Sequence, residues 1–112
     1  MGSTANPLRD GAVGMNENTY SMYFGNMNPT HTGTYNLSLG YGALQNLTTG
    51  KSNTAIGHYS LSGLTLGDYN TFLGYASGHD FSSPNKIITG NVNVAVGNST
   101  LSSMTSGYKN IA

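Results

Sequence analysis

The chain has 112 residues, a length that allows one compact domain or a short stack of repeats. Only 7% of the residues are charged, and the four basic and four acidic side chains give a formal net charge of zero. Such a chain lacks the basic surface that binds phosphate backbones, which argues against nucleic-acid binding. It has no cysteine for disulfides or thiolate metal sites, and no apolar run as long as the roughly twenty residues of a membrane span.

The first residues carry little pattern. Residues 1–9 are interpreted as a tail or an expression remnant, because they hold no apolar stretch of the kind that a signal peptide needs. Residues 10–35 are interpreted as degenerate first coils of the repeat that follows. They contain Asp10-Gly-Ala-Val-Gly14 and Ser21-Met-Tyr-Phe-Gly25, which look like shortened copies of it.

A regular repeat fills residues 36–112, where an Asn is followed four residues later by a Gly. The matches are Asn36 with Gly40, Asn53 with Gly57, Asn70 with Gly74 and Asn93 with Gly97, and a truncated repeat begins at Asn110. Successive Asn residues are 17, 17, 23 and 17 positions apart. Further columns agree: Leu44, Leu61 and Leu101 align, as do Thr48, Thr65 and Thr105, and a second Gly lies three residues before each Asn.

Seventeen residues are too few for a pair of helices, and two fixed glycines per unit break any helical run. Each unit is therefore predicted to hold two short strands between glycine turns, one after the Asn and one around residues such as Leu61 and Leu64. Strands repeated in this way predict an all-β fold, a parallel β-solenoid or β-roll of about 17-residue coils stacked at the ordinary strand spacing of about 4.8 Å.

The strand after the Asn is apolar at two adjacent positions, as in Ala55-Ile56, Phe72-Leu73 and Ala95-Val96. Adjacent strand residues point to opposite faces, so one side chain faces its own coil and the other faces outward. Because a strand that is apolar on both faces needs cover on both, a second copy of the chain is the expected partner.

Asn53-Thr-Ala-Ile-Gly57 and Asn93-Val-Ala-Val-Gly97 resemble the signature of trimeric autotransporter adhesin heads, which are left-handed parallel β-rolls. The longer unit, with Gly40-Tyr-Gly-Ala-Leu44 and Leu47-Thr-Thr-Gly50, is more similar to repeats of bacteriophage tail fibre proteins. The resemblance covers roughly residues 20–112 and implies a surface-exposed homotrimeric fibre. It places the chain in a virion tail fibre or, alternatively, on a bacterial cell surface.

A catalytic function is not expected. Asp10, Glu17, Asp68 and Asp80 have no spacing that suits a paired acid and base. His31, His58 and His79 share no repeat column and match no metal-ligand motif, so neither cofactor nor metal is predicted. The open alternative is that one His from each of three chains meets on a trimer axis and binds a metal there.

Receptor contact is predicted at the insertion of the long unit, residues 75–86, because insertions in repeat proteins form surface loops. The candidate residues for binding a glycan or protein receptor are His79, Asp80, Phe81 and Lys86, together with Tyr41 and Tyr75 at the turn after the first Gly. Two alternatives stay open: the insertion is a bulge without a role, and the tyrosines pack between chains. The repeated Asn and Gly residues are assigned a structural role.

The sequence thus predicts a structural and adhesive fibre segment, with a phage tail fibre as the first interpretation. The head of a bacterial surface adhesin that binds host matrix or glycans is the second. An ice-binding solenoid, a third class, needs a flat face of ranked Thr. The single rank of Thr48, Thr65 and Thr105 has Ile88 in place of the fourth Thr.

Overall fold

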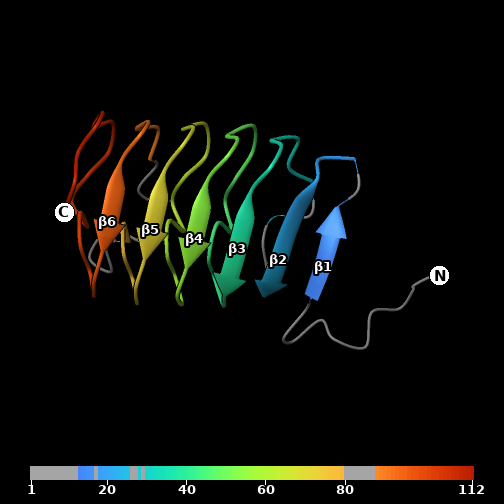
Figure 1. Ribbon diagram of the computed structural model, residues 1–112, viewed down its shortest axis with the longest axis horizontal. Helices are drawn as coiled ribbons and strands as arrows, with labels where there is room; N and C mark the ends of the chain where they lie inside the picture. Colours follow the sequence, from blue (N-terminus) through green and yellow to red (C-terminus); the bar gives the residue numbers. More distant parts are fainter. Residues whose placement is uncertain (1–12, 17, 26–27, 29, 80–87) are drawn as a thin grey trace.

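The computed structural model describes residues 13–16, 18–25, 28, 30–79 and 88–112. Within these residues the chain is all-β, with no helix and one six-stranded sheet whose strand order follows the sequence. Figure 1 shows the strands side by side along the long axis, with β1 and β6 at opposite ends. The strands are β1 (Val13–Asn16), β2 (Ser21–Gly25), β3 (Leu37–Gly40), β4 (Thr54–Ile56), β5 (Thr71–Leu73) and β6 (Val94–Val96).

The five strands from β2 to β6 are parallel, and their register reproduces the sequence repeat. Leu37 pairs with Thr54, Thr54 with Thr71, and Thr71 with Val94. The longer step between β5 and β6 leaves the register intact, so the extra residues of that unit lie outside the strands. Repeat units therefore begin at Ser21, Asn36, Asn53, Asn70, Asn93 and Asn110. Ser21 is the first residue of β2, and each Asn stands immediately before a strand or a bridge partner.

Within the part of the chain that the structure describes, the second strand predicted for each unit is present only as an isolated bridge between Leu64 and Ile88. Residues 41–46 and 58–63 form turns instead. The cause is the backbone, because Leu44, Leu61 and Leu101 have φ of 52°, 50° and 48°, which curls the chain away from an extended path. Ile88 hydrogen bonds to Thr65 through its carbonyl, and its side chain is buried in the core.

The core lies behind the sheet and is built from equivalent positions of successive units. The second strand residue points inward, so Ala55, Phe72 and Ala95 are fully buried. They pack against residues from the turns, with Leu44, Leu47, Leu61, Leu64 and Ile88 in one cluster. The inward and outward positions expected from the two adjacent apolar residues are therefore confirmed for these strands.

Phe72 is a large residue in an inward position that holds Ser38, Ala55 and Ala95 in the other units that begin with Asn, and its unit compensates for this. The position eight residues after the Asn holds Leu in the other units and Gly78 here. A Cβ atom on Gly78 would lie 2.8 Å from Cε2 of Phe72. The Phe72 ring thus fills the space that a leucine occupies in neighbouring units.

The repeated Asn side chains form a buried ladder along the stack. Each Oδ1 accepts hydrogen bonds from the backbone N–H and the Nδ2 of the next Asn, as from Asn70 to Asn53 at 2.9 and 3.0 Å. Each Nδ2 also donates to a glycine carbonyl of the same unit, as from Asn53 to Gly67 at 2.8 Å. Asn53, Asn70 and Asn93 are fully buried, so this ladder satisfies polar groups that would otherwise destabilise the core.

Ser21 takes the place of the Asn in the first unit. Its hydroxyl accepts from the backbone N–H of Asn36 at 3.0 Å and donates to the Gly33 carbonyl at 3.4 Å. The segment before it departs from the pattern, because β1 runs antiparallel to β2. Part of the region interpreted as degenerate first coils therefore pairs as a hairpin, and the parallel stack begins at β2.

The two glycine columns are required for different reasons. Gly57 and Gly97 have φ of 125° and 129°, a conformation that side chains rarely adopt, which confirms the expectation that this column is conformational. Gly50 and Gly67 lack such a φ. A Cβ on either would lie 2.4 or 2.0 Å from a glycine carbonyl of the next unit, so here it is the close approach of two backbones that excludes a side chain.

Candidate functional site

The outer face of the sheet is apolar and exposed. It consists of two rows, one residue per strand: Met22, Leu37, Thr54, Thr71 and Val94 in the first, and Phe24, Leu39, Ile56, Leu73 and Val96 in the second. Met22, Phe24, Leu39 and Val96 are 44%, 40%, 40% and 57% exposed. An aligned row of half-exposed aliphatic and aromatic side chains is the kind of surface that proteins use for association.

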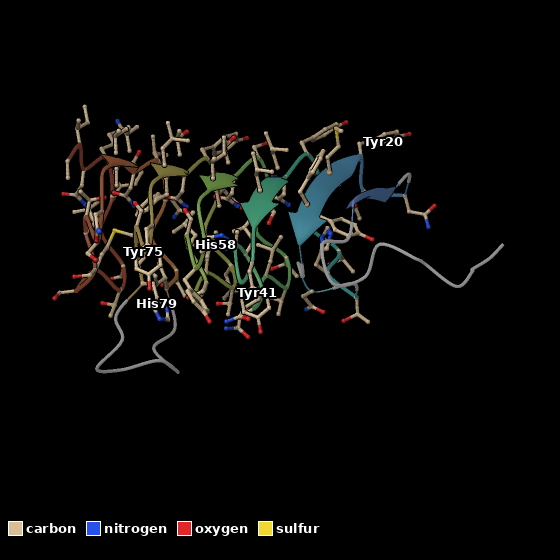
Figure 2. All side chains as sticks on the ribbon, turned by 90° about the horizontal axis from the view of Figure 1, so that it is seen from below. Tyr20, Tyr41, His58, Tyr75 and His79 are labelled. Carbon is tan, nitrogen blue, oxygen red and sulfur yellow. The ribbon has the colours of Figure 1, made fainter. Side chains whose placement is uncertain are left out.

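A second surface, the tyrosine edge, is made by Tyr41, His58 and Tyr75, the residues that follow Gly40, Gly57 and Gly74. Figure 2 shows the three in one row along the molecule, apart from Tyr20. Tyr41 and Tyr75 are 53% and 49% exposed, and His58 is exposed as well. Because the three residues occupy the same repeat position in successive units, sequence reasoning grouped Tyr41 with Tyr75, but it passed over His58 between them.

The tyrosine edge is held in place by contacts from neighbouring units. The backbone N–H of Tyr41 donates to Nδ1 of His58 at 3.0 Å. The Tyr41 ring lies edge-on to the Tyr59 ring, with centroids 5.7 Å apart and planes at 88°. Tyr59 in turn stacks on His79 at 5.2 Å and 22°. These contacts restrict the orientation of the Tyr41 ring before any partner arrives.

A groove lies where the tyrosine edge meets the outer face. It has a volume of about 440 Å³ and is lined by Phe24, Leu39, Ile56, Tyr41 and His58, with glycine backbone between them. The three glycines in the lining, Gly25, Gly40 and Gly57, contribute only main chain to the wall of the groove. Its walls are therefore mostly apolar, with a phenol and an imidazole at one side.

The predicted receptor residues of the insertion fare differently. Asp80, Phe81 and Lys86 lie outside the described residues. His79 is only 7% exposed, its Nδ1 forms a hydrogen bond with the Ser62 hydroxyl, and its ring supports Tyr59. A side chain buried in this way acts inside the fold, so His79 is placed to orient an aromatic neighbour and is poorly exposed for contact with a receptor.

His31, in the first unit, is also buried, at 5% exposure, and its Nδ1 has no hydrogen-bond partner in the described part of the chain. Burial lowers the pKa of His31 from its ordinary value of 6.5, and a hydrogen bond with the Gly33 backbone partly opposes this. The neutral imidazole is therefore favoured in the folded chain. Of the three histidines, His58 is exposed in a turn, whereas His31 and His79 are buried.

Within the described residues, no three His, Cys, Asp or Glu side chains are close enough to hold a metal ion. The same part of the chain contains no helix long and apolar enough to cross a membrane. Its charged side chains, Lys51, Asp68 and Lys109, all lie just before a repeat Asn, at the edge opposite the tyrosine edge. The Asp68 carboxylate accepts from the backbone N–H of Lys51 at 2.9 Å, which gives it a structural role.

Comparison with known proteins does not identify a family. No protein-family model matches the sequence, and no curated protein or solved structure matches it significantly.

Proposed function

We propose that this chain is a segment of a non-enzymatic, adhesive fibre: a parallel β-solenoid that self-associates as a homotrimer and belongs to a phage tail fibre. The observation that carries the proposal is the outer face of the sheet. Its two aligned rows leave Phe24, Leu39 and Val96 between 40% and 57% exposed, while the inward residues Ser38 of β3 and Ala95 of β6 are fully buried. A parallel sheet usually has both faces covered, so a second and third chain would complete this one.

The register supports the solenoid interpretation. Parallel strands one repeat apart, joined by turns that return to the same edge, stack units along one axis, as the 41 Å long dimension and 23 and 21 Å cross-dimensions indicate. The buried Asn ladder adds hydrogen bonds along that axis and gives a rigid rod, which is the mechanical property that a fibre needs. Homotrimer and tail fibre come from the resemblance of the repeat.

A bacterial surface adhesin head remains the second candidate, because the same Asn-to-Gly unit resembles those heads. The ice-binding alternative gains nothing from the fold. Ile88 is buried at the position where an ice-binding solenoid would need an exposed Thr, so the rank of Thr48 and Thr65 is interrupted there.

Assembly is tested by sedimentation equilibrium of the chain at micromolar concentration. A trimer is expected, and Met22→Lys or Val96→Lys should weaken it, because each places a charge in the covered face. The matched control is Tyr69→Lys, whose side chain is 56% exposed at the edge that precedes the strands and should leave the trimer intact. A well-folded monomer of the parent chain would contradict the proposal.

A further inference from the structure

The tyrosine edge combines three properties that suit it to bind a ligand. It presents ring faces from Tyr41 and Tyr75, it presents an imidazole from His58 between them, and it borders a groove (Figure 2). Units stack at the ordinary strand spacing, so the two tyrosines are about 10 Å apart along the row. This spacing suits an elongated ligand that spans two units.

The hydrogen bonding of the edge is defined by His58. Its Nδ1 accepts from the backbone N–H of Tyr41 at 3.0 Å, so the neutral ring carries its proton on Nε2. The imidazole thus offers a donor, and the phenol groups of Tyr41 and Tyr75 offer donors and acceptors. Tyr41 and His58 stand beside the apolar wall formed by Phe24, Leu39 and Ile56, and Tyr75 continues the row beyond the groove.

The charge distribution narrows the ligand class. Lys51, Asp68 and Lys109, the charged residues of the described chain, all precede the strands, and none lines the groove. Among the described residues, an anionic or cationic partner would find no complementary charge in the groove. A sugar ring matches the site, because it has an apolar C–H face that stacks on aromatic rings and a rim of hydroxyls that hydrogen bond.

We infer that the tyrosine edge binds a neutral oligosaccharide, with Tyr41 and Tyr75 as stacking faces and His58 as a hydrogen-bond donor between them. This inference rests on the proposed function, attachment to a cell surface, and names the class of molecule to which the fibre attaches. Tyr59 and His79 act as positioning residues, because they hold the Tyr41 ring from within the fold.

The test is a glycan array carrying neutral oligosaccharides and their sialylated counterparts, followed by titration of the best neutral ligand. The double variant Tyr41→Ala/Tyr75→Ala should weaken binding by about tenfold or more, since it removes two stacking contacts. Tyr41→Phe keeps the ring and should stay within about threefold of the parent. The matched control is Tyr69→Ala, which removes an equally exposed tyrosine from the opposite edge and should leave affinity unchanged.

Sedimentation of each variant separates this site from a chain–chain interface. If the double alanine variant loses the oligomer, the tyrosine edge packs between chains and the inference is wrong. Binding only to sialylated glycans, or to none on the array, also overturns it. Attachment of the parent chain to intact cells distinguishes failure of this inference from failure of the proposed function. A chain that is oligomeric and binds cells, but binds no neutral glycan, keeps the proposed function and contradicts only the inferred ligand.

Discussion

The unit that begins at Ser21 and the unit that begins at Asn70 both depart from the common repeat, in opposite ways. The first changes its ladder residue from Asn to Ser and is shortened to 15 residues. The other keeps Asn as its ladder residue and is lengthened to 23 residues. In its core it has Phe72 where the other Asn units have Ser or Ala, and Gly78 where they have Leu. Both keep the parallel register of their strands.

The comparison separates what the stack requires from what it tolerates. A ladder position must supply one acceptor for the next backbone N–H and one donor for a glycine carbonyl, and a hydroxyl can supply both. A core position must keep its volume together with that of its neighbour. Chain length between strands is constrained least, since residues can be added or removed in the turns.

The largest expected effect comes from substitutions at Phe72 and Gly78 in the core of the Asn70 unit. Phe72→Ala should lower the free energy of unfolding by about 3–5 kcal/mol, because it leaves a cavity. Gly78→Leu alone should also destabilise, because its side chain meets the Phe72 ring. The double variant Phe72→Ala/Gly78→Leu recreates the common unit and should recover most of the loss.

A urea-denaturation cycle of the four proteins measures this coupling. The leucines at the equivalent positions already have a positive φ of about 50°, so the backbone accepts Leu at residue 78. Additive losses in the double variant would show that Phe72 and Gly78 do not compensate for each other.

The next largest expected effect is the loss of stability when a ladder side chain is removed. Asn53→Ala should lower the free energy of unfolding by about 3–5 kcal/mol, because it leaves the Asn70 N–H and the Gly67 carbonyl buried without this partner. Ser21→Ala should cost less, about 1–2 kcal/mol, since its bond to Gly33 is long. Asn53→Ser is the matched control and should fall between them. Equal losses for Ser21→Ala and Asn53→Ala would show that the first unit needs its ladder as strongly as the others.

A third comparison concerns a glycine of the Asn70 unit and its equivalent in the next. Gly74 and Gly97 share a φ near 130°, but a Cβ on Gly74 would lie 2.4 Å from the Gly97 carbonyl oxygen, whereas a Cβ on Gly97 meets only a Thr100 methyl at 3.2 Å. Gly74→Ala should therefore cost about 2 kcal/mol or more, and Gly97→Ala about 1. Thermal melting measures the loss of stability in both variants. Equal shifts in melting temperature would show that the positive φ alone, and not the contact with the next unit, causes the loss.

The smallest effect is a pH dependence from the first unit. The pKa of His31 is lowered by burial, so the unfolded chain binds the proton more readily than the folded chain. Stability should therefore fall as the pH drops below about 6.5, and the loss should be complete below the folded pKa. Urea midpoints at pH 8 and pH 5 should differ less in His31→Gln than in the parent. The same difference in both proteins would assign the pH dependence to other groups.

The sequence was sufficient for the features that repeat. Asn and Gly columns located every parallel strand from β2 onward, predicted the inward and outward alternation, and identified glycines with positive φ. It was insufficient where backbone conformation departs from residue preference. Leu44 and Leu61 adopt positive φ, which leucine seldom does, so a leucine-containing segment that reads as a strand becomes a turn.

The candidate site was predictable only in part. Tyr41 and Tyr75 share a repeat column, and that column also contains His58, so a complete reading of the column would have found the third member. The burial of His79 was not accessible, because it depends on Ser62 and Tyr59 of the preceding unit. Phe72 and Gly78 did carry a signal, since each is the odd residue of its own column within the same unit.

The Asn ladder also sets how such a chain can change its length over evolution. Each Asn bonds directly to the Asn of the adjacent unit, across the 23-residue unit as well, so residues added within a unit leave the length of the stack unchanged. Growth or shrinkage must therefore proceed by duplication or deletion of whole units, each adding about 4.8 Å of rod for seventeen residues. The length of the molecule therefore changes in fixed steps of one unit, and recombination between copies of the repeat is enough to produce such a step.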